Sequence, residues 1–187
     1  SITFRANVAP GQYFEQKYSL TDGAYALDYD LMFNGLENIL APNTETLQLN
    51  WVNYLDKLER NVDYERRMSS VYFKEVDDDA DYCNCNKEDT EDVEGALRWV
   101  AHSNQFFNSA LIADESPFSS GLLQTADTDL GEDVAYLKKL SSELQIPVDA
   151  LSSGYGMTFY IGPKEYDRLA AFDNELQYTI PLGISIF

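Results

Sequence analysis

The chain has 187 residues, so it can bury roughly 70% of its unfolded surface in a core without disulfides or metals. Its 13 basic and 32 acidic residues give a formal net charge of −19, which excludes nucleic acid and anionic lipid surfaces as electrostatic partners. The 13 Tyr and 10 Phe favour pleated, half-buried surfaces, so the composition predicts a mainly β fold.

The first three predicted strands alternate strictly between apolar and polar residues. Residues 2–8 place Ile2 and Phe4 on one face with two further apolar side chains, which predicts a half-buried strand. Residues 13–20 and 25–33 alternate in the same way on either side of an Asp-Gly pair. Because Asp-Gly tolerates the positive φ of a tight reversal, these two segments are predicted to form a β-hairpin.

The next region predicts strands around an acidic excursion. Residues 47–51 continue the alternation and are expected to pair with the same face as the hairpin, and residues 52–70 are expected to connect, with one helical turn, to a strand at 71–76. Residues 75–94 contain ten acids and one base, which predicts a mobile, solvated loop. An EF-hand calcium site is disfavoured there and at 127–133, because no glycine stands at the sixth loop position.

The cysteines and the single histidine offer little chemistry. Cys83 and Cys85 are too close in sequence for an unstrained bridge, and with His102 they are too few for a four-ligand zinc site. Two unpaired surface thiols are expected, with an intermolecular or metal-assisted role as the alternative. His102 falls in a predicted pair of central strands, residues 97–114, on the face opposite Trp99. It is expected to be a hydrogen-bonded structural residue, since no orienting partner for a general base is identifiable.

The last third of the chain predicts strands followed by a short helix. Residues 134–148 fit a strand or a helix, with context favouring strands, and residues 156–162 alternate clearly. Pro163 suits the first turn of a helix that extends to Phe172. In that helix Tyr166 and Leu169 are expected to lie on the sheet, while the charged side chains face outward, and an apolar, extended segment follows to residue 187. The charged set is Lys164, Asp167 and Arg168.

Two spaced segments carry a resemblance to a known family. The segments RWVAHSNQFFNSALIAD and FYIGPKEYDRLAAFDNELQYTIPLG resemble the large periplasmic domain of the YidC membrane-protein insertases of Gram-negative bacteria. The first carries a W-V-x-x-x-x-Q-F-F pattern and the second a G-P-x-x-Y-x-x-L pattern followed by P-L-G. The matching positions are Trp99, Val100, Gln105, Phe106, Phe107, Gly162, Pro163, Tyr166, Leu169, Pro181, Leu182 and Gly183.

The resemblance implies a fold and a place in the cell. The fold is an extended antiparallel β-sandwich, the supersandwich of galactose-mutarotase-like proteins, with a short C-terminal helix. Residues 1–187 are expected to form the larger C-terminal part of a single periplasmic domain, without the flanking transmembrane segments. The domain is expected in the inner membrane, exposed to the periplasm.

The resemblance also implies a function without catalysis. Membrane-protein insertion in this family needs no cofactor, and the implied partners are the SecDF accessory subunits of the Sec translocon and nascent membrane proteins. No catalytic, cofactor-binding or metal-binding residue is predicted. The candidate interaction element, at which the chain leaves the sheet toward the membrane, is Gly162, Pro163, Tyr166, Leu169, Phe172, Pro181, Leu182 and Gly183.

Two alternatives remain open. A carbohydrate-binding or mutarotase-like protein needs a general acid and base in one pocket, for which His102 is the only histidine. A groove of the sandwich that holds an extended polypeptide is the other, and the sequence does not place it.

Overall fold

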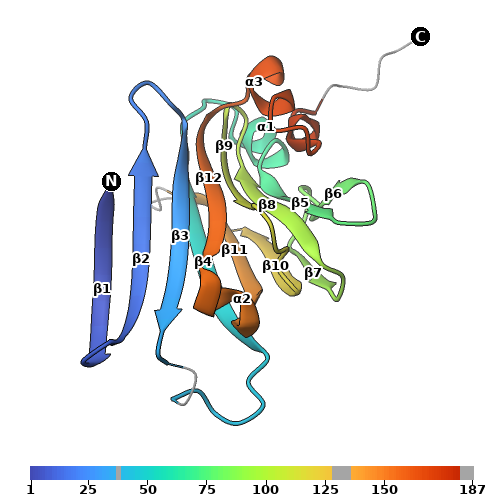
Figure 1. The fold of residues 1–187 in the computed structure, drawn as a ribbon. Helices are drawn as coiled ribbons and strands as arrows, with labels where there is room; N and C mark the ends of the chain where they lie inside the picture. The colour runs from blue at the N-terminus through green and yellow to red at the C-terminus, as the bar shows by residue number, and fades with distance from the viewer. Residues whose placement is uncertain (37–38, 128–135, 182–187) are drawn as a thin grey trace.

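The computed structural model describes residues 1–36, 39–127 and 136–181, and they form two antiparallel sheets that pack face to face without closing into a barrel (Figure 1). The large sheet has eight strands, in the order β1 (Ile2–Ala9), β2 (Gln12–Leu20), β3 (Ala26–Asn34), β12 (Tyr155–Pro163), β9 (Phe107–Ala113), β8 (Leu97–Ser103), β5 (Ser70–Glu75) and β6 (Ala80–Tyr82). The small sheet has four, in the order β4 (Thr46–Asp56), β11 (Tyr136–Pro147), β10 (Ser120–Asp127) and β7 (Asp89–Val93).

The helices are short and connect the strands. They are α1 (Val62–Arg67), α2 (Val148–Ser153), α3 (Tyr166–Ala170) and the 3₁₀ turn η1 (Leu176–Thr179). In the described part of the chain, each helix falls well short of the length and apolarity that crossing a bilayer requires. The prediction of a mainly β fold with a short helix near the C-terminal end is therefore confirmed.

The predicted hairpin is confirmed. Strands β2 and β3 pair in the register Leu20 to Leu27, and Gly23 in the turn has a φ of 74°. Glycine adopts this left-handed conformation without the steric cost that a Cβ brings. The helical turn expected within residues 52–70 is α1, and the two central strands expected within 97–114 are β8 and β9, which are antiparallel.

Two strand predictions need correction. Strand β1 exists, but all of its residues are exposed, so the prediction that it is half-buried was wrong. Strand β4 pairs with β11 in the small sheet, so the expectation that residues 47–51 join the face of the hairpin was also wrong. Alternation shows that a strand has one apolar face, but the residues that cover this face are distant in sequence.

The acidic segment 75–94, predicted to be a mobile, solvated loop, contains two strands. It contains β6, which pairs with β5, and β7, which pairs with β10 and forms an edge of the small sheet. Cys83 between these strands is fully buried, so it is not a surface thiol, whereas Cys85 is partly buried and both thiols are free. The segment is ordered because backbone pairing with apolar neighbours compensates for its sparse apolar content. The candidate loop at 127–133 falls almost wholly outside the described residues.

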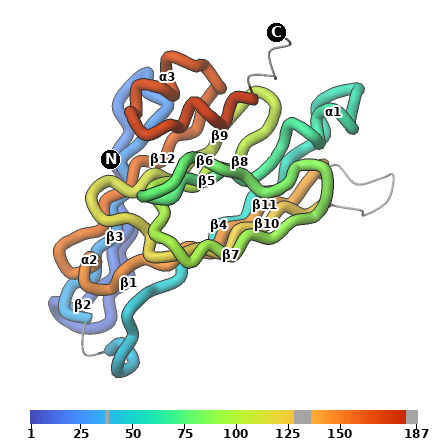
Figure 2. Tube along the Cα trace, turned by 90° about the vertical axis from the view of Figure 1, so that its right-hand side faces the viewer, coloured from blue at the N-terminus to red at the C-terminus, as the bar shows by residue number. Residues whose placement is uncertain are grey.

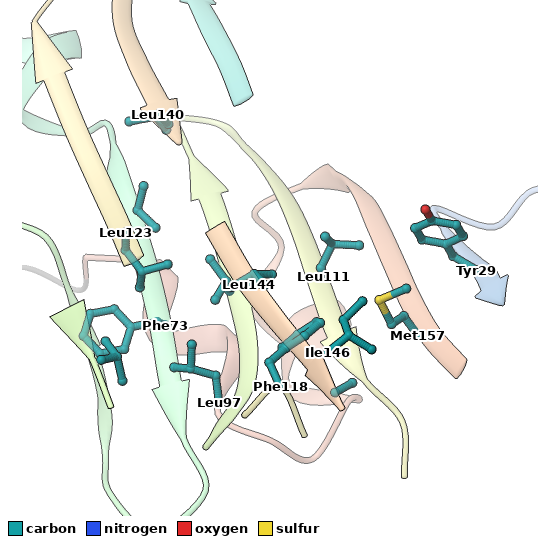
Figure 3. Close-up of a cluster of buried hydrophobic side chains, with 14 of the residues drawn as sticks. Tyr29, Phe73, Leu97, Leu111, Phe118, Leu123, Leu140, Leu144, Ile146 and Met157 are labelled. Atoms are coloured by element: carbon teal, nitrogen blue, oxygen red, sulfur yellow. The ribbon is translucent and has the colours of Figure 1, made fainter. Parts of the chain in front are cut away.

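The main core lies between the two sheets (Figure 3). Leu140 and Leu144 of β11 and Leu123 of β10 contribute from the small sheet, and Leu111 and Met157 contribute from the large sheet. Strand β11 alternates between buried and partly buried residues from Lys138 to Pro147, which confirms the strand interpretation of this segment. The helix α2 directly after it was not predicted.

Candidate functional site

The candidate site is the C-terminal segment, which packs on the face of the large sheet that points away from the small sheet. Along β8, Val100 belongs to the core between the sheets, while Trp99 and Ala101 belong to a second apolar cluster. Figure 2 shows α3 and the small sheet on opposite sides of β5 and β8. The buried members of the second cluster are Tyr72, Trp99, Ala101, Ala110, Ile112, Tyr160, Leu169 and Leu176.

The helix in this segment begins later than predicted. Pro163 is the last residue of β12, opposite Phe107, and α3 begins at Tyr166 after an N-cap at Glu165. The sheet holds Pro163 because its carbonyl accepts a hydrogen bond of 2.6 Å from the Tyr160 hydroxyl. The Lys164 N–H donates to the Phe106 carbonyl at 2.8 Å, which extends the strand pairing past the proline. The predicted start at Pro163 was therefore wrong, and the helix has five residues.

The two apolar residues predicted to lie on the sheet behave differently. Leu169 is fully buried in the second cluster, as predicted, and Phe172 packs edge-on against Tyr160 at 5.6 Å between ring centroids. Tyr166 is 50% exposed, so its predicted contact with the sheet was wrong. A five-residue helix presents only one turn to the sheet, and Leu169 occupies it.

The charged side chains also divide into two groups. Lys164 does not face outward, because its Nζ donates to the Ser103 hydroxyl at 2.8 Å and to the Asn104 carbonyl at 3.0 Å. Burial lowers the pKa of this ammonium to about 8. Arg168 remains at the surface, where it pairs with Glu165 at 3.0 Å and its guanidinium lies 4.7 Å from the centroid of the Tyr25 ring.

Polar contacts hold the residues after α3 on the sheet, and we call Gly162 to Pro181 the clasped segment. The Trp99 indole N–H donates to the Asn174 carbonyl at 2.7 Å, and the Asn108 amide donates to the Thr179 hydroxyl at 2.5 Å. Lys74 lies 3.5 Å from Glu175, which has a left-handed φ of 68°. The expected extended course is therefore wrong for residues 176–179, which form η1. The only sequence signal was the Asp-Asn pair at 173–174, a composition typical of turns.

Close packing leaves no space for a side chain at position 162, which is therefore glycine. It is buried, and a Cβ at this position would lie 2.8 Å from both the Tyr160 hydroxyl and the Tyr25 Cβ. The structure therefore gathers Gly162, Pro163 and Phe172 around Tyr160, which belongs to the same buried cluster as Leu169. Tyr166 and Pro181 are exposed. Leu182 and Gly183 lie outside the described residues.

His102 lies on the other face of the large sheet and has the structural role that was predicted. Its ring stacks on Trp51 with centroids 3.7 Å apart, and its Nε2 lies 2.9 Å from the Ser142 hydroxyl oxygen. The side chain is 2% exposed, and burial lowers its pKa to about 3. An imidazole buried between two sheets cannot reach a sugar in solution. Among the residues that the structure describes, acidic, histidine and cysteine side chains form no cluster that could hold a metal.

Comparison with known proteins shows which family the chain resembles. The model of the family described as "YidC periplasmic domain" matches residues 1–187. The membrane protein insertase YidC of Phocaeicola vulgatus is 32% identical over 90% of this chain and 27% of its own length. That of Parabacteroides distasonis is 26% identical over 100% of this chain and 30% of its own length.

A third relative gives a similar match. The membrane protein insertase YidC of Chlorobium phaeovibrioides is 29% identical over 98% of this chain and 31% of its own length. The chain thus spans about a third of the length of these curated relatives. Since the family model covers every residue from the first strand to the clasped segment, the chain belongs to the YidC periplasmic domain family.

Proposed function

We propose that this domain is an interaction scaffold of the insertase and that its clasped segment, Gly162 to Pro181, sets the position of the domain above the bilayer. The family is non-catalytic, and its periplasmic domain belongs to an inner-membrane protein and faces the periplasm. The observation that carries the proposal is the 2.7 Å hydrogen bond from Trp99 to the Asn174 carbonyl, beside the buried Leu169 and Leu176. A segment held by both apolar packing and hydrogen bonds transmits a force or an orientation to the sheet.

The partners follow from the same element. The proposed partners are accessory subunits of the Sec translocon, SecDF, and nascent membrane proteins, with the membrane reached through transmembrane segments outside residues 1–187. Support comes from the side chains that the clasp leaves exposed, Tyr166 and Tyr178, since aromatic residues are enriched in protein interfaces. Neither side chain is needed to bury the second cluster, so each is available to a partner.

The finer fold is part of the proposal. Two sheets of eight and four antiparallel strands, connected by short helices, fit an extended supersandwich of the galactose-mutarotase type. We propose that residues 1–187 act as a single unit, the larger part of that domain, because the small sheet packs its core directly on the large sheet.

The test separates the interaction from the packing. In the full-length insertase, Tyr166→Asp is expected to reduce insertion of a dependent membrane protein several-fold. Since Tyr166 is half exposed, the same change should alter the free energy of unfolding by less than about 0.5 kcal/mol. Insertion is measured in inverted membrane vesicles and stability by urea unfolding.

A matched control is Tyr64→Asp on α1, another exposed tyrosine, which Figure 2 separates from α3 by the width of the molecule. It should leave insertion unchanged. Wild-type insertion by the Tyr166→Asp variant, at normal protein abundance, would contradict the proposed role of this surface.

A further inference from the structure

The turn between β8 and β9 presents two neighbouring phenylalanines to solvent. Phe106 is 47% exposed and Phe107 is 51% exposed. Ile161 of β12, which is 49% exposed, lies on the same face as Phe107, because Phe107 is opposite Pro163 and the next pair on that face is Ser109 with Ile161. We call Phe106, Phe107 and Ile161 the apolar tip. It lies at the end of β12 that leads into α3 (Figure 1).

Hydrogen bonds within the protein satisfy the backbone of both phenylalanines. The Asn104 side-chain oxygen accepts from the N–H groups of Phe106 and Phe107 at 2.9 and 2.8 Å. The Asn104 N–H donates to the Phe107 carbonyl at 3.0 Å, and the Lys164 N–H donates to the Phe106 carbonyl at 2.8 Å. A backbone whose polar groups are already paired can enter a medium without hydrogen-bonding partners at little cost.

The segments that build this end of the molecule are poor in charge. Residues 99–113 contain no Asp, Glu, Lys or Arg, although such residues make up 24% of the chain. Residues 176–181 contain none either, and Asn108, just after the turn, donates to Thr179 within them. A charged group that does contact the turn is the Lys164 ammonium, which donates to a carbonyl of the turn at 3.0 Å. The surroundings of the tip therefore lack the negative charge of the whole chain.

A dense group of acidic residues lies at the opposite end of the same strands. The register places Ser70 opposite Ser103, beside the turn, and Glu75 opposite Leu97, at the far end of β8. Four of the five residues 75–79 are acidic, and six residues of strand separate them from the tip by roughly 20 Å. This exceeds the Debye length of about 8–10 Å, so these charges do not oppose contact between the tip and a lipid surface.

We propose that the apolar tip inserts into the headgroup region of the inner-membrane bilayer, in contact with neutral, zwitterionic lipid. The inference rests on the proposed function, in which the adjacent clasped segment sets the position of the domain above this bilayer. The domain belongs to an inner-membrane protein and faces the periplasm, so a bilayer lies beside it. Exposed aromatic side chains are typical of membrane interfaces. A protein interface ordinarily adds about one hydrogen bond per 100–200 Å², whereas the backbone of both phenylalanines is already paired.

The test uses the full-length insertase in phosphatidylcholine liposomes that contain phosphatidylcholine with a spin label near the top of the acyl chain. Accessible cysteines are replaced, including Cys85→Ser, and a fluorophore is attached at Phe106→Cys. The control is Val76→Cys, an exposed apolar residue at the acidic end. Quenching by the lipid spin label should be at least about twofold stronger at position 106 than at position 76, because an interfacial side chain lies within roughly 5–10 Å of the headgroups.

Ile161→Cys provides a second labelling position if Phe106→Cys does not fold. Equal quenching at the tip and at position 76 overturns the inference, as does a blue-shifted fluorophore that lipid does not quench, which would show a protein cover instead. The outcome is separate from that of the proposed function. Lipid quenching at the tip together with normal insertion by Tyr166→Asp supports the bilayer contact and contradicts the role of the clasped segment, and the reverse pair of results does the opposite.

Discussion

The centre of the large sheet and its outermost strand, β1, have the same alternating pattern in opposite surroundings. Strand β8 is covered by the small sheet on one face and by the clasped segment on the other, and all but one of its residues are buried. Strand β1 alternates more strictly in sequence, yet each of its residues is exposed. The strength of an alternating pattern therefore predicts that a strand forms, whereas burial depends on the layers that pack against it.

The largest expected effect is a loss of stability at the centre of the large sheet. Trp99→Ala removes a fully buried indole that fills the second cluster and donates to Asn174, so it should lower the free energy of unfolding by about 3–5 kcal/mol. Urea unfolding measures the change. Trp99→Phe, which keeps much of the volume, should cost less, and a loss below about 1 kcal/mol for the alanine variant would show that the clasp does not depend on this residue.

The next effect is the pH dependence of the free energy of unfolding that His102 causes between the two sheets. The pKa of His102 is about 3 in the folded chain and rises on unfolding to its ordinary value of 6.5, so below pH 6.5 the unfolded state binds the additional proton. Stability should fall as the pH falls, with a contribution of up to about 1.4 kcal/mol per pH unit between roughly pH 6 and pH 4. The measurement is urea unfolding at several pH values. His102→Gln should have a shallower slope over this range, and identical slopes would exclude the imidazole as the cause.

A smaller effect tests the close packing below the clasp. Gly162→Ala places a methyl group against Tyr160 and Tyr25, which should cost about 1–3 kcal/mol. The control is Gly95→Ala, where the added methyl meets only the end of the Glu75 side chain. Thermal unfolding of both variants gives the comparison, and equal costs would contradict the tight fit at Gly162.

The smallest effect is expected on β1. In residues 1–187, Phe4→Ala should change the free energy of unfolding by no more than about 0.5 kcal/mol, because the side chain is more than half exposed. Urea unfolding of residues 1–187 with and without the substitution provides the measurement, and a loss above about 1 kcal/mol would contradict the exposed position of Phe4.

The elements that were predicted correctly from the sequence depend on residues that are close together in the chain. The turn at Gly23 and the alternation of β2, β3 and β12 follow from preferences of neighbouring residues, and the hairpin register follows from them. The structural role of His102 followed from the lack of a partner, and its contacts with Trp51 and Ser142 came only with the fold.

The errors have a common physical reason as well. The acidic strand β7 is held by pairing with β10, which begins 27 residues later, at Ser120, and the start of α3 is delayed by the pairing of Pro163 with Phe107. In each case a contact between distant segments outweighs the local preference. Composition alone therefore placed β7 in a loop and Pro163 in a helix.

By itself, the sequence determined the β class, the hairpin, the central strand pair and membership of the family, because these depend on short-range periodicity and on two spaced motifs. Tertiary structure alone decided which sheet receives β4, which face Trp99 and His102 occupy, and that β1 is exposed. A strand pattern repeats every two residues and so specifies two faces, but only packing between distant segments determines what each face contacts.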